Sequence, residues 1–214
     1  FAGDTTLDDA PGALIERGGD PLAKVAHLFQ GADIRLVNLE CVVSTIGSPG
    51  DKVFTFRAHP RVLPVLRRHV DAVTLANNHS GDYGREAFAD MLGLLERAGI
   101  AQTGGGRNLA EAHQPLLIER QGLRLALLSY NEFMPRSFEA GHDAPGIAWS
   151  EDEQVVDDIA LARTRHRADL VLVFMHWGWE NEPTANARQR ELARRVIDAG
   201  ADAVTTGNHV WDQR

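Results

Sequence analysis

The run DAVTLANNHSGDYG at residues 71–84 constrains the fold more than any other part of the sequence. Its first half is apolar and rich in β-branched residues, which is typical of a buried β-strand. The strand ends abruptly at Asn78 and His79, and the glycines that follow turn the chain towards a helix. Open α/β sheets place their ligands just outside the carboxyl ends of their strands. We therefore expect this stretch to bring an amide and an imidazole into a ligand site.

Other predicted strands end in side chains of the same chemical type. Residues 202–209 repeat the D-A-V-T opening and the Asn-His finish, one residue shorter. Because the carboxyl ends of parallel strands lie along one edge of a sheet, all of these side chains are expected to meet. The further sets are Asp4, Asn38 with Glu40, His176, and Asn208 with His209.

Strand and helix patterns alternate along the chain, which predicts an α/β fold with a mainly parallel, layered sheet in a single domain over residues 1–214. Predicted helices cover residues 20–29, where an apolar stripe follows an Asp-Pro start, and residues 60–68, 85–98, 151–165 and 185–199, with a short helix after Asn108. Predicted strands cover residues 34–39, 53–57, 72–76, 170–175 and 203–206, and a hairpin pairs residues 115–119 with 123–129. Residues 4–19 are expected to form a loop, residues 104–106 a flexible turn, and residues 131–150 a rim or lid.

The composition excludes several classes of protein. The formal charge is −8 and no run of Lys or Arg exceeds two residues, which argues against a nucleic-acid partner. The single cysteine, Cys41, excludes an internal disulfide and a cysteine-based zinc site. No apolar run reaches the ~18 residues of a membrane span. Both ends look cut, since Phe1 lies within an apparent strand and Arg214 closely follows one, so the localisation stays open.

The strand-end side chains have the chemistry of a metal site. Carboxylate, amide oxygen and imidazole together suit divalent Mn, Fe or Zn, and a Glu that bridges two ions about 3.5–4 Å apart would permit two-metal hydrolysis. The plainer alternatives are a capping Asp, turn-forming Asn and a satisfied core His. Asp82 is interpreted as a turn or N-cap residue. Candidate substrate contacts are Asn38, Arg57, Trp177 and Glu180.

Five segments together resemble a known family. They are GD at 3–4, NLE at 38–40, ANNHSGDYG at 76–84, HWGWE at 176–180 and GADAVTTGNHV at 200–210. They are similar to the CapA/PgsA poly-γ-glutamate capsule biosynthesis family, which belongs to the calcineurin-like metallophosphoesterase superfamily. The resemblance implies a four-layer α/β/β/α sandwich, a cell-surface or extracytoplasmic location, and membrane proteins of capsule synthesis as partners.

The resemblance also implies roles for individual residues. Asp4 would ligate a first metal and Glu40 would bridge two metals, while His79 would act as general acid near the leaving group. The ligands implied for the second metal are Asn78, His176 and His209.

One position departs from the superfamily pattern. The superfamily usually ends in Gly-x-His-x-His, whereas this chain has Trp211 at the last position. Trp cannot coordinate a divalent metal, so we expect one firm site (Glu40, Asn78, His176, His209) and a weak or empty one at Asp4. An alternative register, in which Asp212 supplies the missing oxygen, stays open.

Three functions follow as hypotheses. The first is a metal-dependent hydrolase acting on a phosphoester or on an amide of an anionic polymer such as poly-γ-glutamate. The second is a non-catalytic module of a capsule-export assembly that binds polymer without turnover, which the Trp at position 211 favours. The third is a phosphodiesterase with a small nucleotide substrate.

Overall fold

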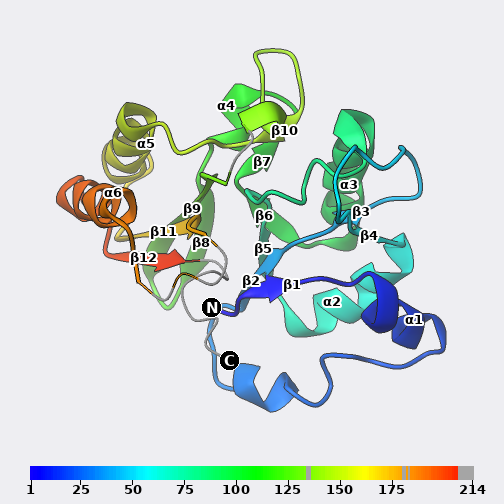
Figure 1. The fold of residues 1–214 in the computed structure, drawn as a ribbon. Helices are drawn as coiled ribbons and strands as arrows, with labels where there is room; N and C mark the ends of the chain where they lie inside the picture. Colours follow the sequence, from blue (N-terminus) through cyan, green and yellow to red (C-terminus); the bar gives the residue numbers. More distant parts are fainter. Residues whose placement is uncertain (134–135, 180–181, 183, 207–214) are drawn as a thin grey trace.

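The computed structural model describes residues 1–133, 136–179, 182 and 184–206, and it confirms a mixed α/β fold with mainly parallel sheets. Two four-stranded sheets face each other (Figure 1). The first has the order β1 (Asp4–Thr5), β2 (Leu36–Leu39), β5 (Ala72–Thr74) and β6 (Ala101–Thr103), all parallel. The second has the order β12 (Ala203–Thr206), β11 (Leu170–His176), β9 (Leu123–Asn131) and β8 (Leu116–Arg120), with only β8 antiparallel.

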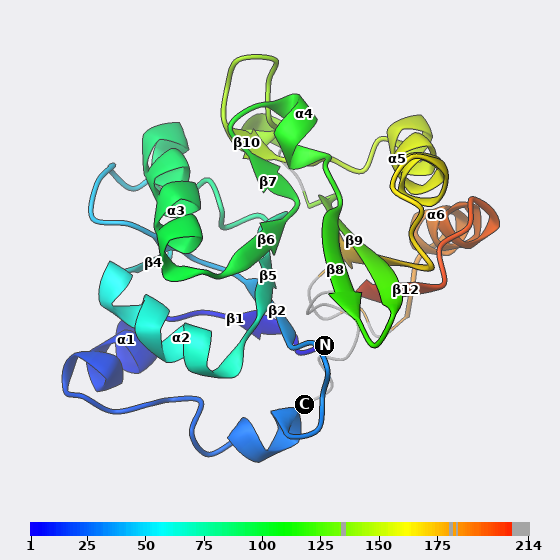
Figure 2. The same ribbon diagram turned by 180° about the vertical axis from the view of Figure 1, so that it is seen from behind.

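Helices cover the outer side of each sheet, as the two opposite views in Figures 1 and 2 show. On the side of the first sheet lie α1 (Asp9–Glu16), α2 (Leu63–His69) and α3 (Gly84–Ala98). On the side of the second lie α5 (Asp152–Thr164) and α6 (Ala187–Asp198). The remaining elements are η1 (Ala26–Phe29), β3 (Val42–Val43), β4 (Arg57–Ala58), η2 (Pro60–Val62), β7 (Gly105–Gly106), α4 (Leu109–Ala112), η3 (Arg136–Phe138) and β10 (Gly146–Ile147).

The alternation of side chains along each strand explains this layering. In β2, Val37 packs in the cluster formed with α2 and α3, whereas its neighbour Leu36 packs in a cluster shared with the second sheet. In β9, Leu128 likewise packs in the cluster formed with α5 and α6, whereas Leu127 faces the first sheet. Successive strand residues point to opposite faces of the sheet, so these strands pack against a helix layer on one face and against the other sheet on the opposite face. Among the described residues, no helix is both long and apolar enough to cross a membrane.

Most of the predicted elements are confirmed. The helix expected over residues 85–98 is α3, and Gly99 ends it with a left-handed φ of 67°. The hairpin is formed by β8 and β9, and Asn108 caps α4 by accepting a hydrogen bond from the backbone N–H of Glu111. The segment at 131–150 contains η3 and β10 and lines a cavity described below.

Two predictions before residue 30 are wrong. Residues 9–16 form α1 rather than a loop, because Asp8 caps the helix and Ile15 is buried in the first core. The helix expected over residues 20–29 is reduced to turns and the short 3₁₀ helix η1, and Val25 is exposed. Asp20 still accepts the backbone N–H of Leu22 with Oδ1, as expected of a cap, while its Oδ2 lies 2.8 Å from the ring of His69 on α2.

Two later predictions are also corrected. The strand expected over residues 53–57 is limited to β4, because Phe56 donates its N–H to Asp82 instead of a neighbouring strand, and Val53 is 90% exposed. The turn expected at residues 104–106 is restricted to Gly104, with φ of 80°, and the next two glycines pair with β10. Gly106 is required there, since a Cβ atom would lie 2.3 Å from the backbone nitrogen of Ala112.

Candidate metal centre

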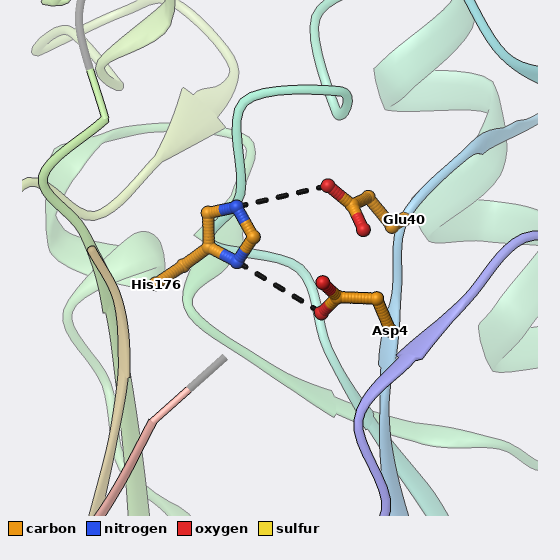
Figure 3. Close-up of side chains that lie close together, drawn as sticks. All are labelled: Asp4, Glu40 and His176. Atoms are coloured by element: carbon orange, nitrogen blue, oxygen red, sulfur yellow. Dashed lines mark ion pairs between the residues drawn. The ribbon is translucent and has the colours of Figure 1, made fainter. Parts of the chain in front are cut away.

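Three side chains from both sheets converge where the strands end. Asp4, Glu40 and His176 each present a ligand atom, and these atoms lie within 4.8 Å of one another. The ring of His176 lies between the two carboxylates, with Nδ1 4.0 Å from Asp4 Oδ1 and Nε2 3.7 Å from Glu40 Oε1 (Figure 3). His176 is completely buried, so the imidazole is held between the sheets by packing.

Strand register explains why these residues meet. Asp4 in β1 is directly paired with Asn38 in β2, and Asn38 is paired with Thr74 in β5. The side chain of Asn38 is fully buried, donates to Asp4 Oδ1 at 2.6 Å and lies 3.4 Å from His176 Nδ1. Its own oxygen accepts hydrogen bonds from Thr74 and Asn77. Asn38, expected to contact substrate, therefore lies beneath the cluster and orients its members.

Asn78 joins the cluster from the loop after β5. Its Oδ1 lies 2.8 Å from His176 Nε2 and accepts a hydrogen bond from that nitrogen when it is protonated. The neighbouring Asn77 is completely buried, and its Oδ1 accepts from the backbone N–H of His79. The two asparagines therefore have different roles: Asn77 stabilises the turn, and Asn78 contacts the imidazole of His176.

The donor set fits a divalent metal. Asp4 Oδ2 is buried and has no hydrogen-bond partner among the described residues, which is costly for a carboxylate oxygen unless something else binds it. Two carboxylates, an imidazole and an amide oxygen within reach suit Mn, Fe or Zn ions. Asp4 and His176 lie in one cluster, so the part of the site that is described does not separate the two metal positions implied by the resemblance.

Cys41, directly after Glu40, has no ligand character. Its side chain is completely buried, and this burial raises the pKa of the thiol to about 12. Because only a thiolate binds metal well, Cys41 stays a packing residue.

His79 stands beside the cluster and is held by Asp82, a role that was not predicted from the sequence. Its Nδ1 lies 2.7 Å from Asp82 Oδ2, and its Nε2 faces Glu40 Oε1 at 4.0 Å. Asp82 is completely buried, forms a close ion pair with Lys52 and accepts from the N–H of Phe56. Asp82 was expected as a turn or N-cap residue, and it does lie in a turn, where its N–H donates to the carbonyl oxygen of His79. The N-cap position of α3 belongs to Tyr83, and the carboxylate of Asp82 binds His79 and the loop before β4. The His-x-x-Asp spacing was the available signal.

A cavity of about 320 Å³ opens beside Asn78 and Asp82. The segment after β9, expected to be a rim, provides much of its wall through Phe133, Arg136 and Phe138. The ring of Phe133 also lies 6.5 Å from the ring of His176, measured between centroids. The cavity therefore adjoins the cluster and has room for part of a substrate.

The remaining predicted site residues lie elsewhere or are not described. Arg57 stacks over the ring of Tyr83 at 4.3 Å, outside the cluster. Trp177 is 3% exposed and packs in the core beneath α5 and α6, so its position is that of a packing residue. Glu180 and His209 lie outside the described residues, as do Trp211 and Asp212.

The fold and the site together define a mixed α/β protein with a candidate divalent-metal centre at the carboxyl ends of its strands. The sequence profile of the family described as "Bacterial capsule synthesis protein PGA_cap" matches residues 1–211. The chain therefore belongs to this bacterial capsule synthesis family, which confirms the resemblance found in the sequence.

Curated relatives agree with this assignment. The chain is 30% identical over 215 residues to the protein named "PGA biosynthesis protein CapA" of Bacillus subtilis (strain 168), an alignment that covers 98% of the chain and 56% of that protein. It is 33% identical over 199 residues to a "Probable polyglutamine synthesis accessory protein" of Mycobacterium tuberculosis (strain CDC 1551 / Oshkosh), covering 87% of the chain and 51% of that protein. The chain thus spans about half the length of these relatives.

One solved structure resembles the fold. A hypothetical protein from Thermus thermophilus superposes with a TM-score of 0.51 at 16% identity, covering 96% of this chain and 66% of that one. At this identity the likeness concerns the fold alone.

Proposed function

We propose that this chain is the metal-dependent hydrolytic domain of a capsule poly-γ-glutamate biosynthesis protein. Its fold would be the four-layer α/β/β/α sandwich of the metallophosphoesterase type. The bond cleaved would be a phosphoester or an amide of the anionic polymer. The main support is the meeting of Asp4, Glu40 and His176, from separate strands of two sheets, around a buried carboxylate oxygen with no described partner.

Asp4, Glu40, Asn78 and His176 would hold the metal, and His209 is proposed as a further ligand. A bound divalent ion would act as a Lewis acid on a phosphoryl or carbonyl oxygen and favour attack by water. The protein groups would fix the position of that oxygen and stabilise the developing charge. Asn38 would contribute by orienting Asp4 and His176.

His79 would serve as the general acid. Because Nδ1 hydrogen-bonds to Asp82, the proton available for transfer is the one on Nε2, which faces the cluster. Protonating a leaving group from a positioned imidazole contributes typically about 10²–10⁴-fold to a rate. Asp82 would orient the ring and stabilise its charged form, and Phe56, 4.3 Å away between centroids, packs against it.

A non-catalytic function is the second candidate. Trp211 stands where the superfamily usually has a metal-binding His, a departure that favours a module that binds polymer for a capsule synthesis and export complex without cleaving it. In that case membrane proteins of the capsule machinery would be its partners.

Metal analysis combined with hydrolysis assays distinguishes these functions. The purified protein would be analysed for bound metal and assayed with Mn or Zn on bis-p-nitrophenyl phosphate and on poly-γ-glutamate. A hydrolase should bind metal and turn over at least one of these substrates. If no metal copurifies, and added Mn or Zn neither binds nor supports turnover, the hydrolase proposal is wrong.

A further inference from the structure

A groove of about 500 Å³ lies between α2 and α3, away from the candidate metal centre. Apolar side chains, including Leu63 and Leu94, line part of it, and three arginines complete its lining: Arg67, Arg68 and Arg97. Leu63 is 4% exposed, whereas the side chains of Arg67 and Arg68 are 48% and 60% exposed. The groove therefore has a recessed apolar floor with cationic groups standing above it.

The charge of this groove contrasts with that of the chain. Its lining contains three guanidinium groups and no carboxylate, although the whole sequence has a net charge of −8. The cavity beside the candidate centre is different, because the acids that pair with its cations belong to its own lining. There Lys52 pairs with Asp82 and Arg136 pairs with Glu139. A bound anion would thus meet a more favourable local field in the groove than beside the candidate centre.

The arginines of the groove keep donors for an external ligand. Arg67 is 3.8 Å from an Asp71 oxygen that Arg35 already binds at 2.7 Å. Arg68 is 3.6 Å from Asp20, whose same oxygen lies 2.8 Å from the ring of His69. For Arg97, no ion pair is found among the described residues. Helix dipoles favour cations at these positions, since all three lie in the last turns of α2 and α3, but they do not account for the apolar groove between them.

We propose that this groove is a second polymer-binding site, which takes a polycarboxylate chain. The choice of poly-γ-glutamate as the occupant rests on the proposed function. Such a chain carries one carboxylate per residue on a backbone of methylene and amide groups. Guanidinium groups bind carboxylates in a two-pronged geometry, and the apolar floor suits the methylenes. An anionic membrane fits less well, because the apolar groups lie below the arginines instead of projecting beyond them.

The position of the groove would allow a polymer bound there to reach the candidate metal centre as well. Helix α2 leads directly into the start of β5, and α3 leads directly into the start of β6. The groove therefore lies at the amino-terminal ends of these strands, whereas the candidate centre lies at their carboxyl ends. The 15 residues of α3 connect the two places and span about 22 Å at 1.5 Å per residue. A long polymer held in the groove raises the local concentration of its other segments at the centre, whereas a short oligomer cannot reach both.

Binding of end-labelled poly-γ-glutamate, followed by fluorescence anisotropy at low ionic strength, tests this inference. The double variant Arg67→Glu/Arg97→Glu should weaken binding by about tenfold or more, since two ion pairs become repulsions. The matched control is Arg165→Glu/Arg194→Glu, which makes the same charge change at exposed arginines on the other side of the molecule. Binding by the control should change less than twofold. Thermal unfolding verifies that both variants are folded, and Arg97→Glu alone, at an exposed helix position, should still weaken binding.

Several results would overturn the inference. Equal losses of polymer binding in both double variants would indicate a general charge effect. No loss of binding in either variant would show that the groove does not bind the polymer. Binding abolished by Glu40→Gln but not by the groove variants would place the polymer only at the metal centre. Binding of phosphatidylglycerol vesicles through the groove arginines, with none of the polymer, would identify a membrane surface instead. The proposed function is tested separately: a protein without metal or turnover that still binds polymer through the groove would lose the hydrolase assignment and keep this site.

Discussion

The carboxylate of Asp82 lies 2.7 Å from Nδ1 of His79 and is completely buried. The pair is formed within one turn, three residues apart, while Lys52 and the N–H of Phe56 hold Asp82 from a different loop. As a result the imidazole is fixed from behind and its Nε2 is directed at Glu40. This arrangement orients a proton-transfer group beside the candidate metal centre, and it leads to the first prediction.

Replacing Asp82 by Asn should lower kcat by about 10²-fold or more, because the ring loses its orienting carboxylate and the stabilisation of its charged form. His79→Ala should lose about 10²–10⁴-fold. Both variants should keep their metal, measured by elemental analysis alongside the hydrolysis rate. The control is Asp157→Asn on the exposed side of α5, which should not change kcat. Normal turnover in His79→Ala would exclude the general-acid role.

Removing a member of the Asp4–Glu40–His176 cluster should weaken Mn or Zn binding severely. We expect His176→Ala to bind these ions at least about 100-fold more weakly, because loss of a direct ligand costs no less than the loss of an outer-shell partner. Isothermal titration calorimetry measures the change. His142→Ala, in which an exposed imidazole is removed, provides the control.

Metal should also raise the thermal stability of the wild-type chain by mass action, by about 2.7 kcal/mol at 100 times Kd. This stabilisation should be absent in His176→Ala. An equal shift in both proteins would show that the metal binds elsewhere.

Asp71→Asn should destabilise the fold by about 1–3 kcal/mol at neutral pH, since Asp71 accepts hydrogen bonds from Arg35 at the starts of β5 and β2. These hydrogen bonds hold the pKa of Asp71 below its ordinary value. A carboxyl with a lowered folded-state pKa contributes stability above its unfolded pKa, about 3.9, and loses it as the pH falls through the folded value.

Urea unfolding of wild type and Asp71→Asn should therefore differ most near neutral pH and converge under acidic conditions. Asp143→Asn, at an exposed loop position, should show no comparable difference at either pH. A constant gap between wild type and Asp71→Asn across the acidic range would mean that the ionised pair is not the source of the stability.

Gly106→Ala should destabilise the chain by about 1–3 kcal/mol, because the new Cβ atom would lie 2.3 Å from the backbone nitrogen of Ala112, which cannot move without displacing α4. Gly3→Ala should be tolerated, since no atom lies within 4 Å of its added Cβ. Chemical denaturation of the two variants measures the difference. Equal stabilities would show that α4 adapts freely.

Local patterns explain why much of the fold was predictable. The helix α3 has an apolar stripe that repeats at helical spacing, and Gly99 ends it. The hairpin has two runs rich in strand-forming residues, separated by Gln121-Gly122. Each element is therefore specified by residues close together in the sequence. By contrast, residues 20–29 show the same kind of stripe and do not form the expected helix. Leu22 of this stripe packs against the first core, whereas Val25 is exposed, so the rest of the fold covers only part of the stripe. A periodic pattern predicts a helix only where the fold supplies a surface for it.

The sequence by itself determined the kinds of side chain at the ends of the strands and, through its motifs, the family to which the chain belongs. Only the tertiary structure decided which of these side chains meet. It joined Asp4 and Glu40 to His176 across two sheets, placed Asn38 beneath them and assigned Asp82 to His79. The physical reason is that strand register and sheet packing depend on contacts between residues distant in sequence, whereas a motif records only what its neighbours require.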